Sequence, residues 1–285
     1  MTSDDEPPQD LDRSDLHSGA VGEQQELPSW EALFAARQFG AAYRAYRIAR
    51  TMGVNDGLDP ATGAVVTQSL AALADIEEHI RDRSFVKALD RLQRLDERAD
   101  LVPWTALEAD IKALEATGKL LDQRESEQAL EALGQLDGSW FEAEVEAQRG
   151  TAHIYEGRFD EAKISFEAAL AVDPQHFRAL TNLGNVALEE KRVDDAIDYY
   201  QRAIKLNDGF ANAHHNLGVA YRRKGHLSKS VKSLKTAQRL AQRREASDAR
   251  AKLGKLGSGP NTTKWLRWLL MAGAAFAVYY LFLRN

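Results

Sequence analysis

The chain has 285 residues, 44% of them hydrophobic and 28% charged, which is the balance of a globular protein and excludes a wholly disordered one. It contains no cysteine, which excludes disulfide bonds, thiolate metal sites and a cysteine nucleophile. The formal net charge of -6 is unevenly spread, because residues 1–28 are acidic and residues 222–255 are basic.

The first predicted element is a disordered acidic tail, residues 1–28. This segment holds eight acidic residues, one arginine and three prolines. It buries too little apolar surface to offset the entropy that is lost on ordering. It also lacks the basic and apolar regions of a signal peptide, so we expect no secretion by that route.

Helices are predicted along the chain from Trp30 to Arg243. Apolar residues recur there at helical spacing, as at Leu70, Leu73 and Ile76. No run of alternating β-branched residues is present, as a strand would require. The predicted fold class is therefore all-α.

Residues 29–142 are expected to form a helical region with degenerate repeats. The segments Arg37–Tyr43 and Arg83–Leu89 both resemble a later segment, residues 157–162, in which a turn leads into a helix. The glycine expected in the first helix of each pair is missing or displaced in this region. The similarity therefore rests on the turns.

A repeat of 34 residues follows. The tripeptide Asn-Leu-Gly at 182–184 recurs at 216–218, and Gly150 lies another 34 residues upstream of Gly184. Small residues at fixed positions let two helices approach closely, and one large residue in each repeat fills the space between them. The large residues are Phe166, Tyr200 and Leu234, in repeats assigned to residues 143–176, 177–210 and 211–244.

This period and these positions resemble the tetratricopeptide-repeat (TPR) family. The resemblance defines a predicted TPR domain at residues 143–252 and implies a solenoid of helical hairpins. It also implies that the first helix of each repeat lines a concave groove that binds peptides. The groove residues implied here are Arg178, Asn182, Asn185, Asn212, His215, Asn216 and Arg222.

The asparagines of this groove suit an extended peptide, because each amide offers both a donor and an acceptor to a backbone. The alternative is that Asn182 and Asn216 only follow the family consensus. The carboxylate clamp of chaperone-binding members is matched only in part. Asn185 and Asn216 agree with it, but Thr181 stands where the family has a lysine.

A basic stripe is predicted on the second helix of the third repeat. It could be the polar face of a capping helix or a surface that faces a membrane. It lacks interleaved aromatic residues, so we expect no nucleic-acid partner. The stripe consists of Lys229, Lys232, Lys235, Arg239 and Arg243.

The last predicted elements are a basic flexible linker, residues 253–264, and an apolar segment, residues 265–283. At ~1.5 Å per residue a helix of this length is about 28 Å long, close to the ~30 Å hydrocarbon core of a bilayer. Tryptophans mark one end and tyrosines the other. The sequence therefore predicts a single C-terminal transmembrane helix, a tail anchor with membrane lipid as a partner; a buried core helix is the alternative.

The excess of Lys and Arg before this segment predicts a single-pass membrane protein whose repeat domain faces the cytoplasm. Arginine outnumbers lysine and alanine is abundant, as in proteins from GC-rich bacterial genomes, which favours the bacterial inner membrane. The mitochondrial outer membrane and the endoplasmic reticulum are the alternatives for a eukaryotic source.

No phosphate-binding, dinucleotide-binding, zinc-protease or hydrolase motif occurs in the chain. His214 and His215 are adjacent, so on a helix they point about 100° apart and do not form a metal pair. We therefore predict no enzymatic activity, no catalytic residue, no cofactor and no metal.

The sequence predicts a membrane-tethered adaptor that recruits a cytoplasmic partner protein, or a subunit of a complex, through the concave groove. The main alternative is a structural protein that self-assembles into a homo-oligomer through its repeats. An enzyme within residues 30–140 is a third alternative.

Overall fold

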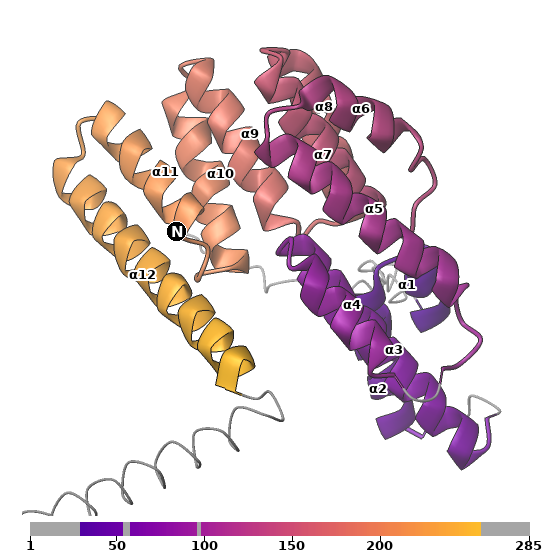
Figure 1. Cartoon of the computed structure of the whole chain (residues 1–285). Helices are drawn as coiled ribbons and strands as arrows, with labels where there is room; N and C mark the ends of the chain where they lie inside the picture. Colours follow the sequence, from indigo (N-terminus) through magenta and orange to yellow (C-terminus); the bar gives the residue numbers. More distant parts are fainter. Residues whose placement is uncertain (1–28, 54–57, 96–97, 258–285) are drawn as a thin grey trace, which may run out of the picture.

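The computed structural model describes residues 29–53, 58–95 and 98–257. These residues form helices and no strand, so the prediction of an all-α fold is confirmed for them (Figure 1). The helices are α1 (Trp30–Ala35), α2 (Phe39–Thr51), α3 (Pro60–Arg81), α4 (Phe85–Gln93), α5 (Trp104–Asp122), α6 (Ser126–Gly134), α7 (Glu142–Tyr155), α8 (Phe159–Val172), α9 (Phe177–Glu189), α10 (Val193–Leu206), α11 (Ala211–Arg223) and α12 (Leu227–Gly257).

The described helices pair in chain order into hairpins, α1 with α2 through to α11 with α12. The turns of these hairpins share one conformation. In each, the residue after the C-cap of the first helix has a positive φ, for example 72° at Gly157 and 63° at Lys191. The other four turn residues of this kind are Arg37, Arg83, Arg124 and Gly225.

The hydrogen bonds of these turns are those of a Schellman motif. In the α7–α8 turn the N–H of Gly157 donates to the Ile154 carbonyl, and the N–H of Arg158 donates to the His153 carbonyl. The same pair of bonds, with the same spacing, occurs in the other hairpin turns from α1–α2 to α11–α12. The early hairpins thus end their first helices as the later ones do.

Close approach within the later hairpins depends on glycines of the first helices. A Cβ atom added to Gly150 would lie 2.6 Å from Cε1 of Phe166, and one added to Gly184 would lie 2.5 Å from Cε1 of Tyr200. Both aromatic side chains are fully buried. The structure therefore shows the expected packing, in which a large residue of the second helix fills the space left by a glycine of the first.

The largest core cluster joins the N-terminal hairpins to the repeats. Buried residues of α2 to α7 contribute to it, among them Phe39, Ile76 and Ile111. Phe39 lies against the segment that leads into α7, with its ring centroid 6.4 Å from that of Trp140 and 6.5 Å from that of Phe141. Helices α1 to α4 are thereby packed onto the start of the repeats.

Helix α3 also contacts the turns that connect successive repeats. Arg81, at its C-terminus, donates from Nε to Oδ2 of Asp173 at 2.7 Å, in the loop between α8 and α9. The amide of Asn207, in the loop between α10 and α11, donates to Oδ1 of Asp82 at 3.3 Å. The chain therefore folds back, and α3 lies beside two loops far away in the sequence (Figure 1).

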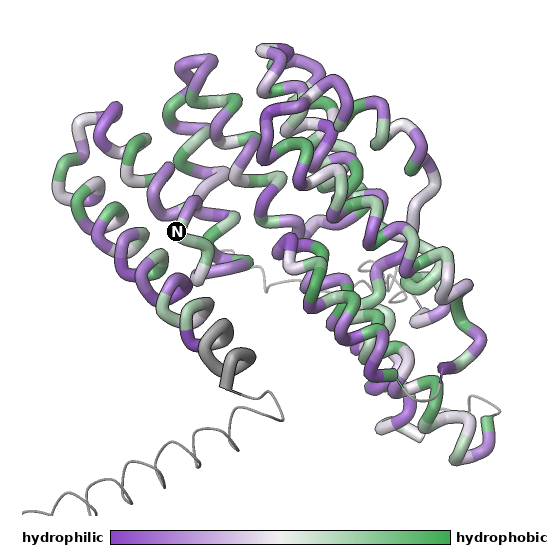
Figure 2. The backbone as a smooth tube through the Cα atoms, in the orientation of Figure 1, coloured by the Kyte–Doolittle hydropathy of each residue, from purple (hydrophilic) through white to green (hydrophobic). Residues whose placement is uncertain are grey.

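The predicted membrane localisation is corrected by the structure. Within residues 29–53, 58–95 and 98–257, no helix is long and apolar enough to cross a bilayer. The longest of them, α12, carries nine Lys and Arg residues, and its hydrophilic positions appear in purple along much of its length in Figure 2. The segment 265–283, on which the prediction rested, lies outside the described residues.

Several predicted domain boundaries also fall outside the part of the chain that the structure describes. Residues 1–28 and 258–264 are among them. The first five residues of the predicted linker, 253–257, belong to α12. The other boundaries stay predictions.

Candidate functional site

Three of the predicted groove residues form a ladder of side-chain hydrogen bonds across the first helices α7, α9 and α11. Asn216 donates from Nδ2 to Oδ1 of Asn185 at 2.7 Å. Asn185 donates to Oδ1 of Asn182 at 3.4 Å, and Asn182 donates to Oγ1 of Thr151 at 3.3 Å. The three asparagines are partly exposed. We call Thr151, Asn182, Asn185 and Asn216 the amide ladder.

The buried side chain of Tyr200 on α10 holds the amide ladder in place. Its hydroxyl donates to Oδ1 of Asn185 at 2.8 Å. Burial raises the pKa of Tyr200, so this hydroxyl stays protonated and remains a donor. Because Asn185 Oδ1 accepts from both Tyr200 and Asn216, its two lone pairs are used within the protein.

Polar capacity remains at the ladder for a ligand. Oδ1 of Asn216 accepts no hydrogen bond from the described residues, and one N–H of each asparagine amide is also unused there. An amide fixed in this way presents a donor or an acceptor in a set direction, which suits a peptide backbone.

The remaining predicted groove residues lie around the ladder and do not bond to it. Arg178, one turn before Asn182 on α9, is partly buried, with its guanidinium carbon 5.8 Å from the ring centroid of Phe210. Asn212, His215 and Arg222 are exposed on α11. The structure thus brings three of the seven predicted residues into one network and leaves three on the surface of the neighbouring helix.

A basic hollow of about 450 Å³ lies between the N-terminal hairpins and the repeats, with Arg178 in its lining. Its cations come from the α3–α4 turn, from α4, α5 and α9, and from the long helix α12. Only Arg178 among them was predicted as a site residue. The cations of the basic hollow are Arg83, Lys87, Lys119, Arg178 and Arg244.

Gly118 of α5 makes room for one of these cations. A Cβ atom at this position would overlap the guanidinium of Arg83, whose Nε atom is buried and has no hydrogen-bond partner among the described residues. The hollow could not be predicted from the sequence, because the residues that line it are distant along the chain and follow no shared period. Gly118 faces a cation, whereas Gly150 and Gly184 of the later repeats face an aromatic ring, and this difference became visible only in the structure.

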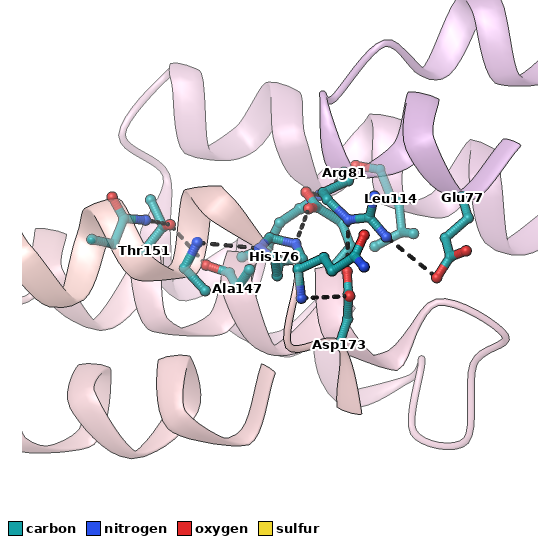
Figure 3. A network of polar contacts seen from close by, with 12 residues as sticks. Glu77, Arg81, Leu114, Ala147, Thr151, Asp173 and His176 are labelled. Carbon is teal, nitrogen blue, oxygen red and sulfur yellow. Dashed lines mark hydrogen bonds and ion pairs between the residues drawn. The ribbon is translucent and has the colours of Figure 1, made fainter. Parts of the chain in front are cut away.

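A buried polar network connects α5, α7 and α9 (Figure 3). Nδ1 of His176 accepts from the N–H of Ala179 at 3.1 Å, so the ring proton resides on Nε2, which lies 3.2 Å from Oε2 of Glu144. Gln148 donates to Oε1 of Glu144 at 3.0 Å and accepts from the hydroxyl of Thr117 at 2.6 Å. Each of these side chains finds its partner inside the protein, so the network is structural.

A cavity of about 860 Å³ lies between α2, α3 and the loops that connect the repeats. Glu77 is at its edge, where it accepts from the N–H of Gly40 at 2.7 Å and faces Arg81, which bonds to Asp173 (Figure 3). Burial raises the pKa of Glu77 to about 7, although Arg81 and the Gly40 N–H oppose the shift. No group of three or more metal-ligating side chains occurs in the described ranges.

Two family models described as tetratricopeptide repeat match residues 147–213 and 187–253. The part of the chain from residue 147 to residue 253 is therefore similar to tetratricopeptide repeats. The peroxisomal targeting signal receptor of Yarrowia lipolytica is 35% identical to this chain over 78 residues. The match covers 27% of this chain and only 13% of that receptor.

Solved structures with a similar arrangement of helices include MamA, at 21% identity and a TM-score of 0.41, over 59% of this chain and 95% of MamA. A second is the second TPR of Spaghetti (RPAP3) bound to the HSP90 peptide SRMEEVD, at 22% identity and a TM-score of 0.34. That match covers 35% of this chain and 92% of the Spaghetti chain.

Proposed function

We propose that this protein is an interaction scaffold whose repeats bind an extended segment of a partner protein along α7, α9 and α11. The observation that carries the proposal is the amide ladder, because partly exposed amides of α9 and α11 and the hydroxyl of Thr151 on α7 are bonded in a row across three successive first helices. A ladder of this kind repeats its donors and acceptors along one line, as a peptide backbone does.

The surface around the ladder supports the same role. Asn212, His215 and Arg222 are exposed on α11 and offer side chains that could select the partner. The Yarrowia relative is named as a receptor for a targeting signal, which agrees with binding of a protein segment, although the match covers a small part of it. We propose no catalytic step.

A selection from a phage-displayed peptide library tests this proposal, with the full chain as bait. The variant Asn182→Ala/Asn216→Ala removes two amides of the ladder and leaves Asn185, which bonds to Tyr200, in place. Selected peptides should bind this variant about tenfold more weakly, because each lost hydrogen bond is worth ~0.5–1.5 kcal/mol. Lys163→Ala on α8 is the control and should bind as the wild type does.

The proposal would be wrong if the double variant kept wild-type affinity for the selected peptides while its circular dichroism was unchanged. The ladder would then be a device that joins the repeats, and the peptides would bind elsewhere. If the double variant lost both affinity and helicity, the single variant Asn216→Asp would be measured in its place. Aspartate keeps an oxygen that accepts hydrogen bonds, but it cannot donate to Asn185 as Asn216 does.

Self-assembly is a second candidate, and one observation favours it. Leu227 and Val231 are each 66% exposed, one turn apart on α12, the last described helix. An apolar pair on a terminal helix could pack against a repeat of another copy. Sedimentation velocity tests this: a mass that rises with concentration and stops rising after Val231→Lys would favour assembly.

A further inference from the structure

The basic hollow holds more positive charge than its own acidic side chains neutralise. Two of the three acids that line it are already paired: Asp122 with Arg83 at 3.3 Å, and Glu115 with Lys119 at 2.9 Å. The third, Asp82, accepts from Asn207. Within the described residues Lys87, Arg178 and Arg244 have no ion-pair partner.

The guanidinium groups of the hollow also lie close enough to repel one another. Burial lowers the pKa of Arg178, Glu144 and Asp82 raise it, and both Arg83 and Arg244 lower it further. Three arginines from three separate elements therefore share one field. A carboxylate placed among them would relieve this repulsion and could accept two parallel hydrogen bonds from a guanidinium.

We propose that the acidic segment of this chain, residues 1–28, docks in the basic hollow. The segment carries eight acidic residues and one arginine, including three consecutive acids at 4–6. The charges of the two surfaces are therefore complementary, which favours their association. This proposal adds a partner for residues that the proposed peptide groove does not use.

The length of residues 1–28 is sufficient for this segment to reach the basic hollow. Twenty-eight residues can extend over about 90 Å, which is longer than a domain of this size is wide. A segment attached to the same chain also has an effective concentration in the millimolar range, so a weak contact is occupied. A hollow of about 450 Å³ admits a few side chains, so a short acidic stretch would fill it.

The test uses full-length chains and a fluorescein-labelled synthetic peptide of residues 1–28, followed by fluorescence anisotropy at low ionic strength. In one variant, the neutral-tail chain, the eight acids of residues 1–28 are changed to Asn or Gln. Its hollow is free, so it should bind the peptide about tenfold more tightly than the wild-type chain, whose own segment competes.

Charge reversal in the hollow should weaken this binding. Lys87→Glu/Arg244→Glu in the neutral-tail chain changes two exposed residues without ion-pair partners, and should weaken peptide binding about tenfold or more. The matched control, Lys232→Glu/Arg239→Glu, makes the same charge change elsewhere on α12 and should bind nearly as the neutral-tail chain does. A zero-length carbodiimide cross-link between Lys87 or Lys119 and residues 1–28 of the same wild-type chain is the direct readout.

Equal peptide affinity of the wild-type and neutral-tail chains, or no loss on reversing Lys87 and Arg244, would overturn the proposal. A neutral-tail chain that binds a poly-glutamate peptide in the hollow, but not the peptide 1–28, would assign the hollow to a different acidic partner and equally overturn it. None of these outcomes depends on the peptides selected for the amide ladder, so the failure of one proposal is distinguishable from the failure of the other.

Discussion

At the scale of single residues, the packing of the repeats depends on the absence of a side chain at Gly184. The Cβ that an alanine would add lies 2.5 Å from Cε1 of Tyr200, closer than such atoms come in proteins. The ring of Tyr200 is fully buried, and its hydroxyl is fixed to Asn185. The ring therefore cannot move away without breaking that bond.

We expect Gly184→Ala to lower the free energy of unfolding by about 1–3 kcal/mol, as overpacking of a core does. Gly134→Ala is the matched control. An added Cβ at Gly134, the last residue of α6, meets no atom within 4 Å, so this change should be neutral or slightly stabilising. Urea denaturation followed by circular dichroism measures both. Equal stability of the two variants would show that the repeat has room for a side chain at position 184.

At the scale of elements, the hairpin turns place residues with side chains in a conformation that favours glycine. Lys191 has φ 63°, and its equivalents in the flanking hairpins are glycines, Gly157 and Gly225. Left-handed backbone costs a residue with a Cβ roughly 1 kcal/mol more than it costs glycine. The Schellman bonds around Lys191 compensate for this cost.

Lys191→Gly should therefore raise the free energy of unfolding by about 0.5–1 kcal/mol, after allowance for the greater entropy of glycine in the unfolded chain. Lys191 is exposed, so the change removes little packing. The control Arg192→Gly changes the next residue, which has a negative φ, and should destabilise. Thermal unfolding of the two variants distinguishes them; a loss of stability in Lys191→Gly would show that its side chain matters more than its backbone.

The same turns explain how much of the fold the sequence could predict. The period of 34 residues identified α7 to α12, because each helix there has 13 or 14 residues apart from the extended α12. The early hairpins have the same turn, but α3 has 22 residues and α5 has 19, so no constant period survives. Arginine stands at Arg37, Arg83 and Arg124 where a glycine would have marked the turn.

The candidate site was predictable to a similar extent. Asn182, Asn185 and Asn216 follow from their positions in the repeat, which predict the helix and the face on which they lie. Their bonds to one another depend on side-chain rotamers, which a periodic pattern does not specify. The basic hollow is lined by side chains from α4, α5, α9 and α12, and an arrangement of residues so distant in the sequence leaves no periodic trace.

At the scale of the whole molecule, the contact between α3 and the repeat loops contains a carboxyl group that is costly to ionise. Burial raises the pKa of Glu77 from 4.5 to about 7, and Asp173 adds to the shift, while Arg81, the Gly40 N–H and Arg44 oppose it. Its side chain is 16% exposed. The folded chain therefore holds a proton on Glu77 under conditions in which the unfolded chain has lost it.

The sign of the effect on stability follows from this difference in proton binding. Between pH 4.5 and about 7 the folded state binds more protons at Glu77 than the unfolded state does, so the stability from this group falls as the pH rises through that window. Below the window the contribution is fully present, and above it the contribution is lost. A shift of this size corresponds to about 3 kcal/mol as an upper limit.

Glu77→Gln should remove this pH dependence, because the amide keeps an oxygen that accepts from the Gly40 N–H and cannot ionise. We expect the variant to be at least as stable as the wild type at pH 8 and to gain less on acidification to pH 5. The control Glu78→Gln removes one negative charge from the exposed neighbour and should leave the slope unchanged. Urea midpoints of the three proteins at both pH values decide the matter: a wild-type slope that persists in Glu77→Gln would show that another group at the contact between α3 and the repeat loops takes up the proton.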